Sequence, residues 1–144
     1  MRKIAKVLFL LSVLTVVLSA CSKEKRIEHW LVRKDGKWDV TSIDYKYYVN
    51  NTLQSSANIP NAGNIVFDKK GSVVMTLVLN GSPETSSGTW TNTKDQITMM
   101  FNGEASVFKI LDKPKKDKMT IQTTDYNNST GEKEEYTAYI KLAD

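Results

Sequence analysis

Apolar and polar side chains alternate along the chain from residue 64 onward, most regularly in 72–79, 96–102 and 133–142. A period of two residues is typical of a strand with one buried face. The pattern predicts that the following side chains point inward: Val73, Met75, Leu77, Ile97, Met99, Phe101, Met119, Ile121 and Ile140.

Turn signals separate these segments at short intervals. Asp68-Lys69-Lys70-Gly71 and Asn102-Gly103 both favour a tight reversal. The resulting strands are expected at 38–49, 65–67, 72–79, 88–92, 96–102, 104–111, 118–126 and 133–142. Short strands joined by consecutive hairpins predict an all-β fold, an up-and-down antiparallel β-barrel of about eight strands.

Three segments depart from this regularity. Inward parity changes within 38–49, from Trp38 and Val40 to Ile43 and Tyr45, which indicates a bulge or bend. Residues 50–63 are polar, so we expect a long loop there and a second one at 80–87. Residues 27–32 fit either a short first strand or a turn of helix that caps the domain.

The first 20 residues have a different pattern. Arg2, Lys3 and Lys6 precede an apolar stretch, 7–18, that is interrupted only by Ser12 and Thr15. A core of about 12 residues is shorter than the roughly 20 needed to span a bilayer. A basic start followed by a short apolar core predicts a cleaved secretory signal peptide.

Leu18-Ser19-Ala20-Cys21 at the end of this leader resembles the bacterial lipobox. The resemblance implies cleavage after Ala20 and a lipid on the Cys21 sulfur. An ordinary signal peptide that contains a cysteine is the alternative, and the short core disfavours an uncleaved membrane helix. We therefore expect a signal peptide (1–20), a lipidated tether (21–29) and a barrel domain (30–144). The expected location is the cell envelope, at the outer membrane through the lipid anchor.

Composition limits the partners of the mature chain. The leader holds three of the 20 basic residues and no acidic one, so 17 basic residues remain against 16 acidic. A nearly neutral chain argues against binding nucleic acid through a basic face. Cys21 is the only cysteine, so disulfides cannot stabilise the fold and a hydrophobic core must.

Several motifs resemble one family. Gly36-Lys37-Trp38 is similar to the Gly-x-Trp opening of lipocalins, and Ser87-Gly88-Thr89-Trp90 resembles a strand entry in small lipocalin-like lipoproteins of Bacteroidetes. Phe67 to Gly71, and Phe108 to Leu111 followed by Asp117 to Ile121, match that group in the same order. The resemblance implies an eight-stranded calycin-type barrel over 30–142.

Two features differ from true lipocalins. The arginine that packs over their first tryptophan has no counterpart here, and Lys141 is the nearest basic residue. The mature chain is also short. Both features argue against a roomy cavity, since a barrel of eight strands can be filled by its own side chains.

The sequence carries little catalytic chemistry. His29 is the only histidine, and Cys21 is expected to carry the lipid. Neither a metal site nor a nucleophile-histidine-acid arrangement is favoured, and we expect a protein that is not an enzyme and needs no cofactor.

The candidate barrel-lining residues are Met75, Leu77, Trp90, Met99 and Phe101, with Trp90 interpreted as a core residue. Aromatic residues offer a second candidate site. Tyr45, Tyr47 and Tyr48, together with Trp30, Trp38 and Trp90, have the surfaces to stack a sugar or an apolar ligand. We favour the simpler interpretation, in which the tryptophans fill the core and the tyrosines form cross-strand pairs.

Two functions remain open at this point. The first is an envelope lipoprotein that binds a small apolar ligand, such as a fatty acid or isoprenoid, or acts as a non-catalytic scaffold. An apolar ligand is expected because the inward face has few polar partners to offer. The alternative is a protein-binding module, or an inhibitor of a hydrolase, that acts through the predicted loops 50–63 and 80–87.

Overall fold

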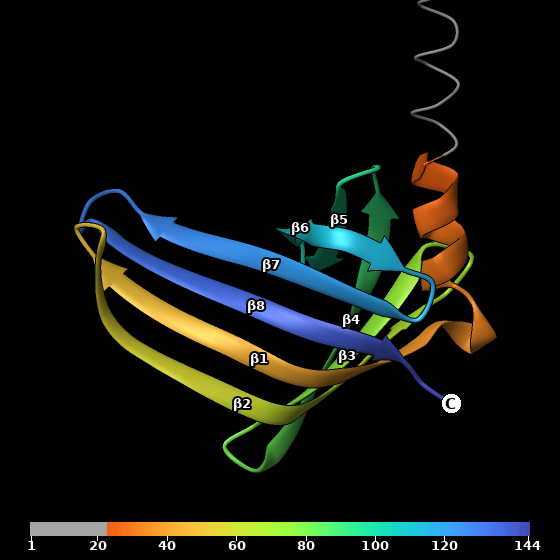
Figure 1. The fold of residues 1–144 in the computed structure, drawn as a ribbon, viewed down its shortest axis with the longest axis horizontal. Helices are drawn as coiled ribbons and strands as arrows, with labels where there is room; N and C mark the ends of the chain where they lie inside the picture. Colours follow the sequence, from red (N-terminus) through yellow and green to blue (C-terminus); the bar gives the residue numbers. More distant parts are fainter. Residues whose placement is uncertain (1–22) are drawn as a thin grey trace, which may run out of the picture.

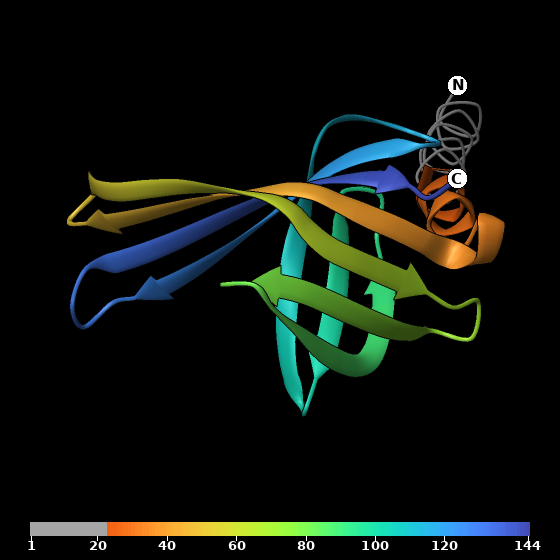
Figure 2. The same cartoon turned by 90° about the horizontal axis from the view of Figure 1, so that it is seen from below.

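The protein is a closed antiparallel barrel, seen from two directions in Figures 1 and 2. The computed structural model describes residues 23–144. A helix (residues 23–31) and a 3-10 turn η1 (Lys34–Gly36) precede β1 (Lys37–Val49), β2 (Thr52–Phe67), β3 (Ser72–Leu79), β4 (Ser82–Asn92), β5 (Gln96–Phe101), β6 (Glu104–Lys115), β7 (Lys118–Asn127) and β8 (Glu132–Leu142). Each strand pairs with the next, and β8 pairs with β1. The predicted up-and-down barrel of eight strands is confirmed.

Residues 23–29 are helical, although they belong to the segment 21–29 for which a tether is predicted. Ile27 and Leu31 lie four residues apart, so they share one helix face, and they are 1% and 0% exposed. The indole nitrogen of Trp38 donates a hydrogen bond of 2.9 Å to the carbonyl of Leu31. The helix therefore closes one end of the barrel, while Cys21 lies outside the described residues (Figure 1).

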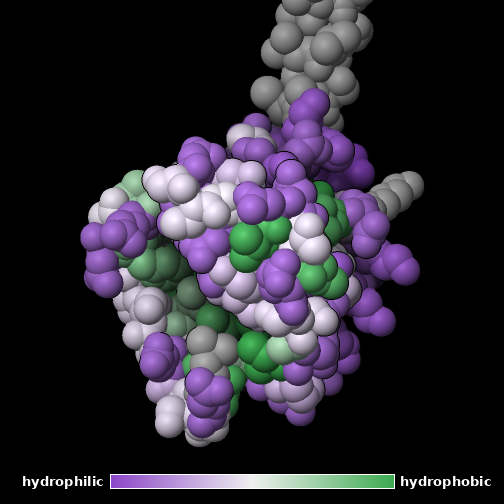
Figure 3. All heavy atoms as spheres, turned by 90° about the vertical axis from the view of Figure 1, so that its left-hand side faces the viewer, coloured by the Kyte–Doolittle hydropathy of each residue, from purple (hydrophilic) through white to green (hydrophobic). Residues whose placement is uncertain are grey.

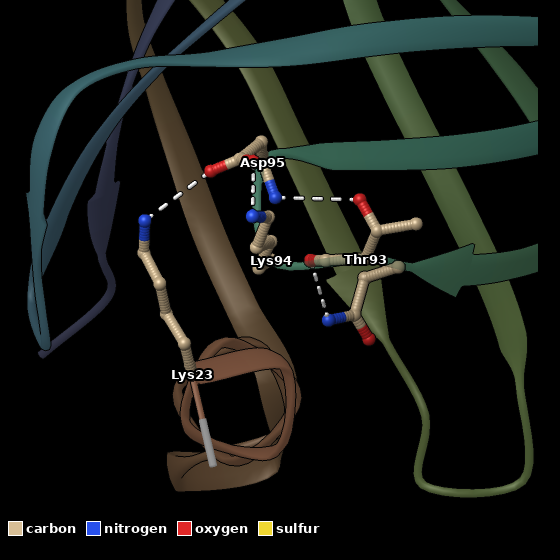
Figure 4. A network of polar contacts seen from close by, with 5 residues as sticks. Lys23, Thr93, Lys94 and Asp95 are labelled. Atoms are coloured by element: carbon tan, nitrogen blue, oxygen red, sulfur yellow. Dashed lines mark hydrogen bonds and ion pairs between the residues drawn. The ribbon is translucent and has the colours of Figure 1, made fainter. Parts of the chain in front are cut away.

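The helix is also joined to the turn between β4 and β5 (Figure 4). Lys23 Nζ lies 3.2 Å from Asp95 Oδ1, and Asn92 Nδ2 donates to the carbonyl of Glu24 at 3.1 Å. The Lys23–Asp95 pair is more than half exposed, so it contributes at most about 1 kcal/mol. Burial of Ile27 and Leu31 is the main force that holds the helix in place.

The parity change within β1 is a bulge, as predicted. The pairing of β1 with both β2 and β8 shifts register between Val40 and Ser42. Thr41 Oγ1 donates to the carbonyl of Tyr139 at 2.9 Å and so occupies the irregular position. Beyond the bulge, Ile43 and Tyr45 continue the inward face.

Two predicted loops are strands, which corrects the interpretation of 50–63 and 80–87. Asn50 and Asn51 adopt positive φ angles of 48° and 63° and form the tight turn, so β2 starts at Thr52. Asn80 and Gly81 do the same before β4. Backbone pairing with the neighbouring strand holds these segments, although most of their side chains are exposed.

The barrel is open at the end opposite the helix. The pairing of β2 with β3 involves only Gly63 to Phe67, and the pairing of β6 with β7 involves no residue of β7 beyond Gln122. Segments 52–62 and 123–127 therefore continue without β3 and β6. Together with the adjoining parts of β1 and β8 they form a four-stranded projection, called here the extended sheet (Figures 1 and 2).

The core occupies the closed end. Trp38, Phe67, Ile97, Met99 and Ile121 are at most 1% exposed. All nine side chains predicted to point inward are either buried in this core or packed against it. Lys141, on β8, is exposed, and the helix rather than a basic side chain covers Trp38.

Candidate functional site

The inner face of the extended sheet changes from apolar to acidic toward its tip. The residues of β1 that face inward mark four successive rows, each with its partners on β2 and β8. Next to the core, Ile43 lies opposite Ile59 and Ala138, and in the second row Tyr45 lies opposite Ala57 and Tyr136. In the third row Tyr47 lies opposite Ser55 and Glu134, and at the tip Val49 lies opposite Glu132. Residues directly opposite in antiparallel strands share one face. Strands β1 and β8 thus place aromatic and acidic side chains side by side.

Three tyrosine hydroxyl groups donate hydrogen bonds to two carboxylates on this inner face. Tyr45 and Tyr136 donate to the two oxygens of Glu134, at 3.1 Å and 2.8 Å. Tyr47 donates to Glu132 Oε1 at 2.8 Å. The rings of Tyr45 and Tyr136 lie 5.1 Å apart at 41°, a cross-strand aromatic pair.

The hydrogen bonds of this cluster favour a charged Glu132 and neutral phenols. Hydrogen bonds from Thr130 and Tyr47 lower the pKa of Glu132. Partial burial and the bond to Glu134 raise the pKa of Tyr45, and the bond to Glu132 raises that of Tyr47. Partial burial is also the main reason why the pKa of Tyr136 is raised. The phenols therefore act as neutral donors, and Glu132 acts as a charged acceptor.

These groups surround an open pocket of about 440 Å³, here named the acidic rim. Its lining consists of Tyr45, Tyr47, Asp125, Asn127, Glu132 and Glu134. Three carboxylates and no basic side chain contribute to it. Tyr48 points to the opposite face, where Lys133 Nζ lies 3.9 Å from its ring centre.

Below the acidic rim, the molecule is hollowed between the extended sheet and strands β3 to β6. Figure 3 looks into this end and shows hydrophobic residues deep in the hollow, between more polar walls. The name apolar hollow is used here for half-buried apolar side chains that pack against the core and that the strand register places toward this end: Ile59, Met75, Leu77, Phe101 and Ala138. Directly beneath them, Val73 and Met99 are buried. The barrel is thus filled at the helix end and open at the other.

The five predicted lining residues divide between these two zones. Met75, Leu77 and Phe101 are half-buried in the apolar hollow, whereas Met99 and Trp90 are 0% and 7% exposed. Trp90 donates to the carbonyl of Asp68 at 3.0 Å and packs edge-on against Phe67, so its interpretation as a core residue is confirmed. Whether any of the five contacts a ligand stays a prediction.

The three tyrosines and three tryptophans considered as a stacking site for a sugar or an apolar ligand do not come together in the structure. Trp38 is completely buried beneath the helix, and Trp30 packs at that same end. Tyr45 and Tyr47 lie at the opposite end. The cross-strand interpretation of the tyrosines is correct for Tyr45, which pairs with Tyr136.

The acidic partners of the tyrosines were not among the predicted site residues. Alternation in 133–142 places Tyr136 and Ala138 on the inward face, and two further steps of the same period reach Glu134 and Glu132. That signal is present in the sequence. The contact with Tyr45 and Tyr47 depends on the β1–β8 register, which the pattern alone does not contain.

Other chemistry is not assembled in residues 23–144. His29 is exposed and lies on the helix, away from the acidic rim. Within that range, no three His, Cys, Asp or Glu side chains are grouped closely enough to hold a metal ion. The one helix of the described chain falls short of the length and apolarity needed for a membrane span.

No protein-family model and no curated protein matches the chain. Solved structures resemble it at low identity. An uncharacterised protein from Bacteroides eggerthii is 16% identical, over 74% of this chain and 97% of its own, with a TM-score of 0.42. A bovine odorant-binding protein, solved with a selenium-containing odorant, is 15% identical over 79% and 76%, with a TM-score of 0.47. Lobster apocrustacyanin A1 is 16% identical over 84% and 72%, with a TM-score of 0.46.

Strand number, order and direction define the class of this fold. Eight antiparallel strands in sequential order close on themselves, with a Gly-x-Trp segment at the start of β1. This is a lipocalin-like barrel. The fold alone does not determine what the barrel does, so function must be argued from the open end.

Proposed function

We propose that this protein binds a small, mainly apolar molecule in the apolar hollow. The observation that carries the proposal is the set of half-buried apolar side chains at the open end of an otherwise filled barrel. Each such side chain gains about 25 cal/mol for every Å² that a ligand removes from water. A ligand of modest size that covers Met75, Leu77 and Phe101 would be held without any catalytic group.

The acidic rim restricts the chemistry of that ligand. Asp125, Glu132 and Glu134 surround the mouth without a basic partner in the pocket. Like charges 4 Å apart repel by about 1 kcal/mol in water and about 4 kcal/mol at an effective dielectric constant of 20. A fatty acid with its carboxylate at the mouth is therefore disfavoured, and a neutral apolar molecule such as an isoprenoid is preferred.

We also propose that the protein acts at the cell envelope through a lipid on Cys21. The lipobox-like segment at the end of a signal peptide supports this location. The alternative role is a protein-binding module that uses loops 50–63 and 80–87. Both segments are mostly strand, so such a contact would have to use exposed strands rather than loops.

A titration with a neutral, fluorescent apolar probe tests ligand binding. Leu77→Trp fills the apolar hollow, whereas Val74→Trp adds the same side chain to the exposed outer face of β3, where Val74 is 37% exposed. We expect saturable binding that Leu77→Trp abolishes and Val74→Trp preserves. Absence of saturable binding, or equal loss in both variants, would contradict the proposal.

A further inference from the structure

The two ends of the barrel carry opposite charge. The acidic rim lies at the open end, and a second concave surface of about 690 Å³ lies beside the helix at the closed end. This surface is named here the basic cleft, and it is lined by His29, Val32, Arg33, Lys34, Asp35, Phe67, Asp68, Lys69 and Lys70. Figure 1 shows the two ends at opposite extremes of the long axis, the hairpin tips on the left and the helix on the right.

The basic side chains of the cleft have few internal partners. It holds four Lys or Arg residues and two acidic residues. The Asp68 carboxylate is already engaged, because its Oδ1 accepts a 2.6 Å hydrogen bond from the Lys70 backbone. Among residues 23–144, the ion pairs involve Lys23, Lys94 and Lys133, none of which lines the cleft. Its cations therefore face solvent and can meet an external anion.

The position of the cleft relative to the chain start favours a lipid surface as that anion. Residue 23, the first described residue of the helix, lies two positions after Cys21 in the sequence. Two residues span at most about 7 Å, which is within the Debye length of about 8–10 Å at physiological salt. A membrane held at Cys21 would thus lie within electrostatic range of the start of the helix, where exposed Lys25 and Arg26 lie among exposed Glu24 and Glu28. The basic cleft lies at the other end of this helix, so its cations meet the bilayer when the closed end of the barrel turns toward it.

We propose that the closed end of the barrel docks on an anionic lipid bilayer through the basic cleft. Anionic headgroups attract clustered Lys and Arg residues near the surface, and the attraction decays over a Debye length. The acidic rim would be repelled by the same surface. The mouth of the apolar hollow therefore points away from the membrane that carries the protein. The inference uses the proposed lipid anchor only to bring the closed end near the bilayer.

The test uses the unlipidated mature chain with Cys21→Ser, so that binding to vesicles reports the protein surface alone. Sedimentation with vesicles of phosphatidylcholine that contain about one third phosphatidylglycerol is compared with pure phosphatidylcholine. We expect binding only to the anionic vesicles, at least tenfold above the neutral ones at about 0.05 M salt and lost at about 0.5 M. Absence of binding to the anionic vesicles would overturn the proposal.

Two charge-reversal variants show whether the basic cleft is the contact. Lys69→Glu with Lys70→Glu changes the cleft, whereas Lys46→Glu with Lys109→Glu makes the same charge change on exposed faces elsewhere in the barrel. We expect about a tenfold loss for the first pair and little change for the second, with thermal midpoints near that of the parent. Equal loss in both would mean that net charge governs binding and would overturn the docking surface. Lys69→Ala with Lys70→Ala replaces the first pair if the glutamates prevent folding.

These measurements are independent of the proposed ligand. The same unlipidated protein can be titrated with the neutral apolar probe in the absence of vesicles. Loss of probe binding with intact vesicle binding would contradict the proposed function alone. Intact probe binding without vesicle binding would contradict the docking surface alone.

Discussion

Trp38 and Leu31 join the helix to the barrel by one directed contact. The Trp38 indole nitrogen donates to the Leu31 carbonyl at 2.9 Å, and both residues are completely buried. The bond satisfies a carbonyl at the C-terminal end of the helix, where the helix itself provides no N–H donor. The closed end is therefore sealed by a helix whose last turn is bonded to the first strand.

The helix should contribute strongly to stability through its buried face. We expect Leu31→Ala to lower the free energy of unfolding by about 2–5 kcal/mol, because it leaves a cavity against Trp38. Glu28→Ala changes an exposed side chain on the same helix and should have an effect within about 0.5 kcal/mol. Denaturant unfolding of both variants measures the difference. Similar values for the two would mean that the helix is dispensable.

Gly36 is required by both its backbone angle and its surroundings. Its φ is +67°, and a Cβ there would lie 1.8 Å from the Phe67 carbonyl oxygen. Gly81 has a φ of +81° but no atom within 4 Å of the corresponding position. We expect Gly81→Ala to cost about 1–2 kcal/mol from backbone strain alone, and Gly36→Ala to cost clearly more. Thermal unfolding checks the order, which the reverse ranking would contradict.

Stability should decrease outside a central pH range because of the tyrosine–glutamate contacts. The pKa of Glu132 is lowered in the folded state, so its contribution is present above the unfolded value near 4.5 and is lost as pH falls. The pKa values of Tyr45, Tyr47 and Tyr136 are raised, so their contribution is present below about 10 and is lost as pH rises further. Denaturant unfolding across the pH range measures the loss of stability at acid pH (the acid limb) and at alkaline pH.

Tyr47→Phe provides the control for that pH profile. It removes the hydrogen bond to Glu132, so the acid limb should become shallower. Absorbance of tyrosinate in the parent protein should also show phenols that ionise above the ordinary value near 10.0. An acid limb that is identical in the parent and in Tyr47→Phe would contradict the assigned role of this contact.

Removing charge from the acidic rim should change ligand preference. In the double variant Glu132→Gln, Glu134→Gln, two of the three carboxylates of the rim become neutral amides. We expect affinity for an anionic fluorescent fatty acid to rise by at least severalfold, because like-charge repulsion at the mouth is reduced. Affinity for the neutral probe should change little in the same titration. An equal change for both probes would point to altered shape rather than charge.

Membrane attachment that withstands high salt should depend on Cys21. Within residues 23–144 the helix is unsuited to crossing a bilayer, and the lipobox-like segment ends at this cysteine. We expect Cys21→Ala to move the protein from the membrane fraction to the high-salt wash, since salt also screens the basic cleft. Retention in the pellet after that wash would contradict lipid attachment at this residue.

The barrel could be predicted because its turns and inward faces leave local signals. Asn102-Gly103 forms the expected hairpin between β5 and β6, and Ile97, Met99 and Phe101 alternate as a half-buried strand must. These signals arise where one face of a strand meets the core, so they are readable without knowing the partner strand.

The extended sheet could not be predicted in the same way. Residues 52–58 are exposed on both faces, so the strand leaves no alternation of apolar and polar positions. The sequence left a short strand and a capping turn of helix as alternatives for 27–32 for a related reason, since Ile27 and Leu31 are the only buried residues of the described helix among charged neighbours. The tyrosine–glutamate cluster requires the register of β1 against β8, a long-range property that neither segment contains.

Because β2 diverges from β3, part of β2 has an unpaired edge at which another chain could add a strand. Segment 52–62 pairs with β1 on one side only, and β2 contains no charged residue. The comparable segment of β7, 123–127, carries Asp125. Charges on an unpaired strand discourage recruitment of another chain, and their absence permits it. At high protein concentration, aggregation by strand pairing between molecules should therefore start at β2. The divergence of β2 from β3 thus opens the barrel and also limits the concentration at which the protein stays monomeric.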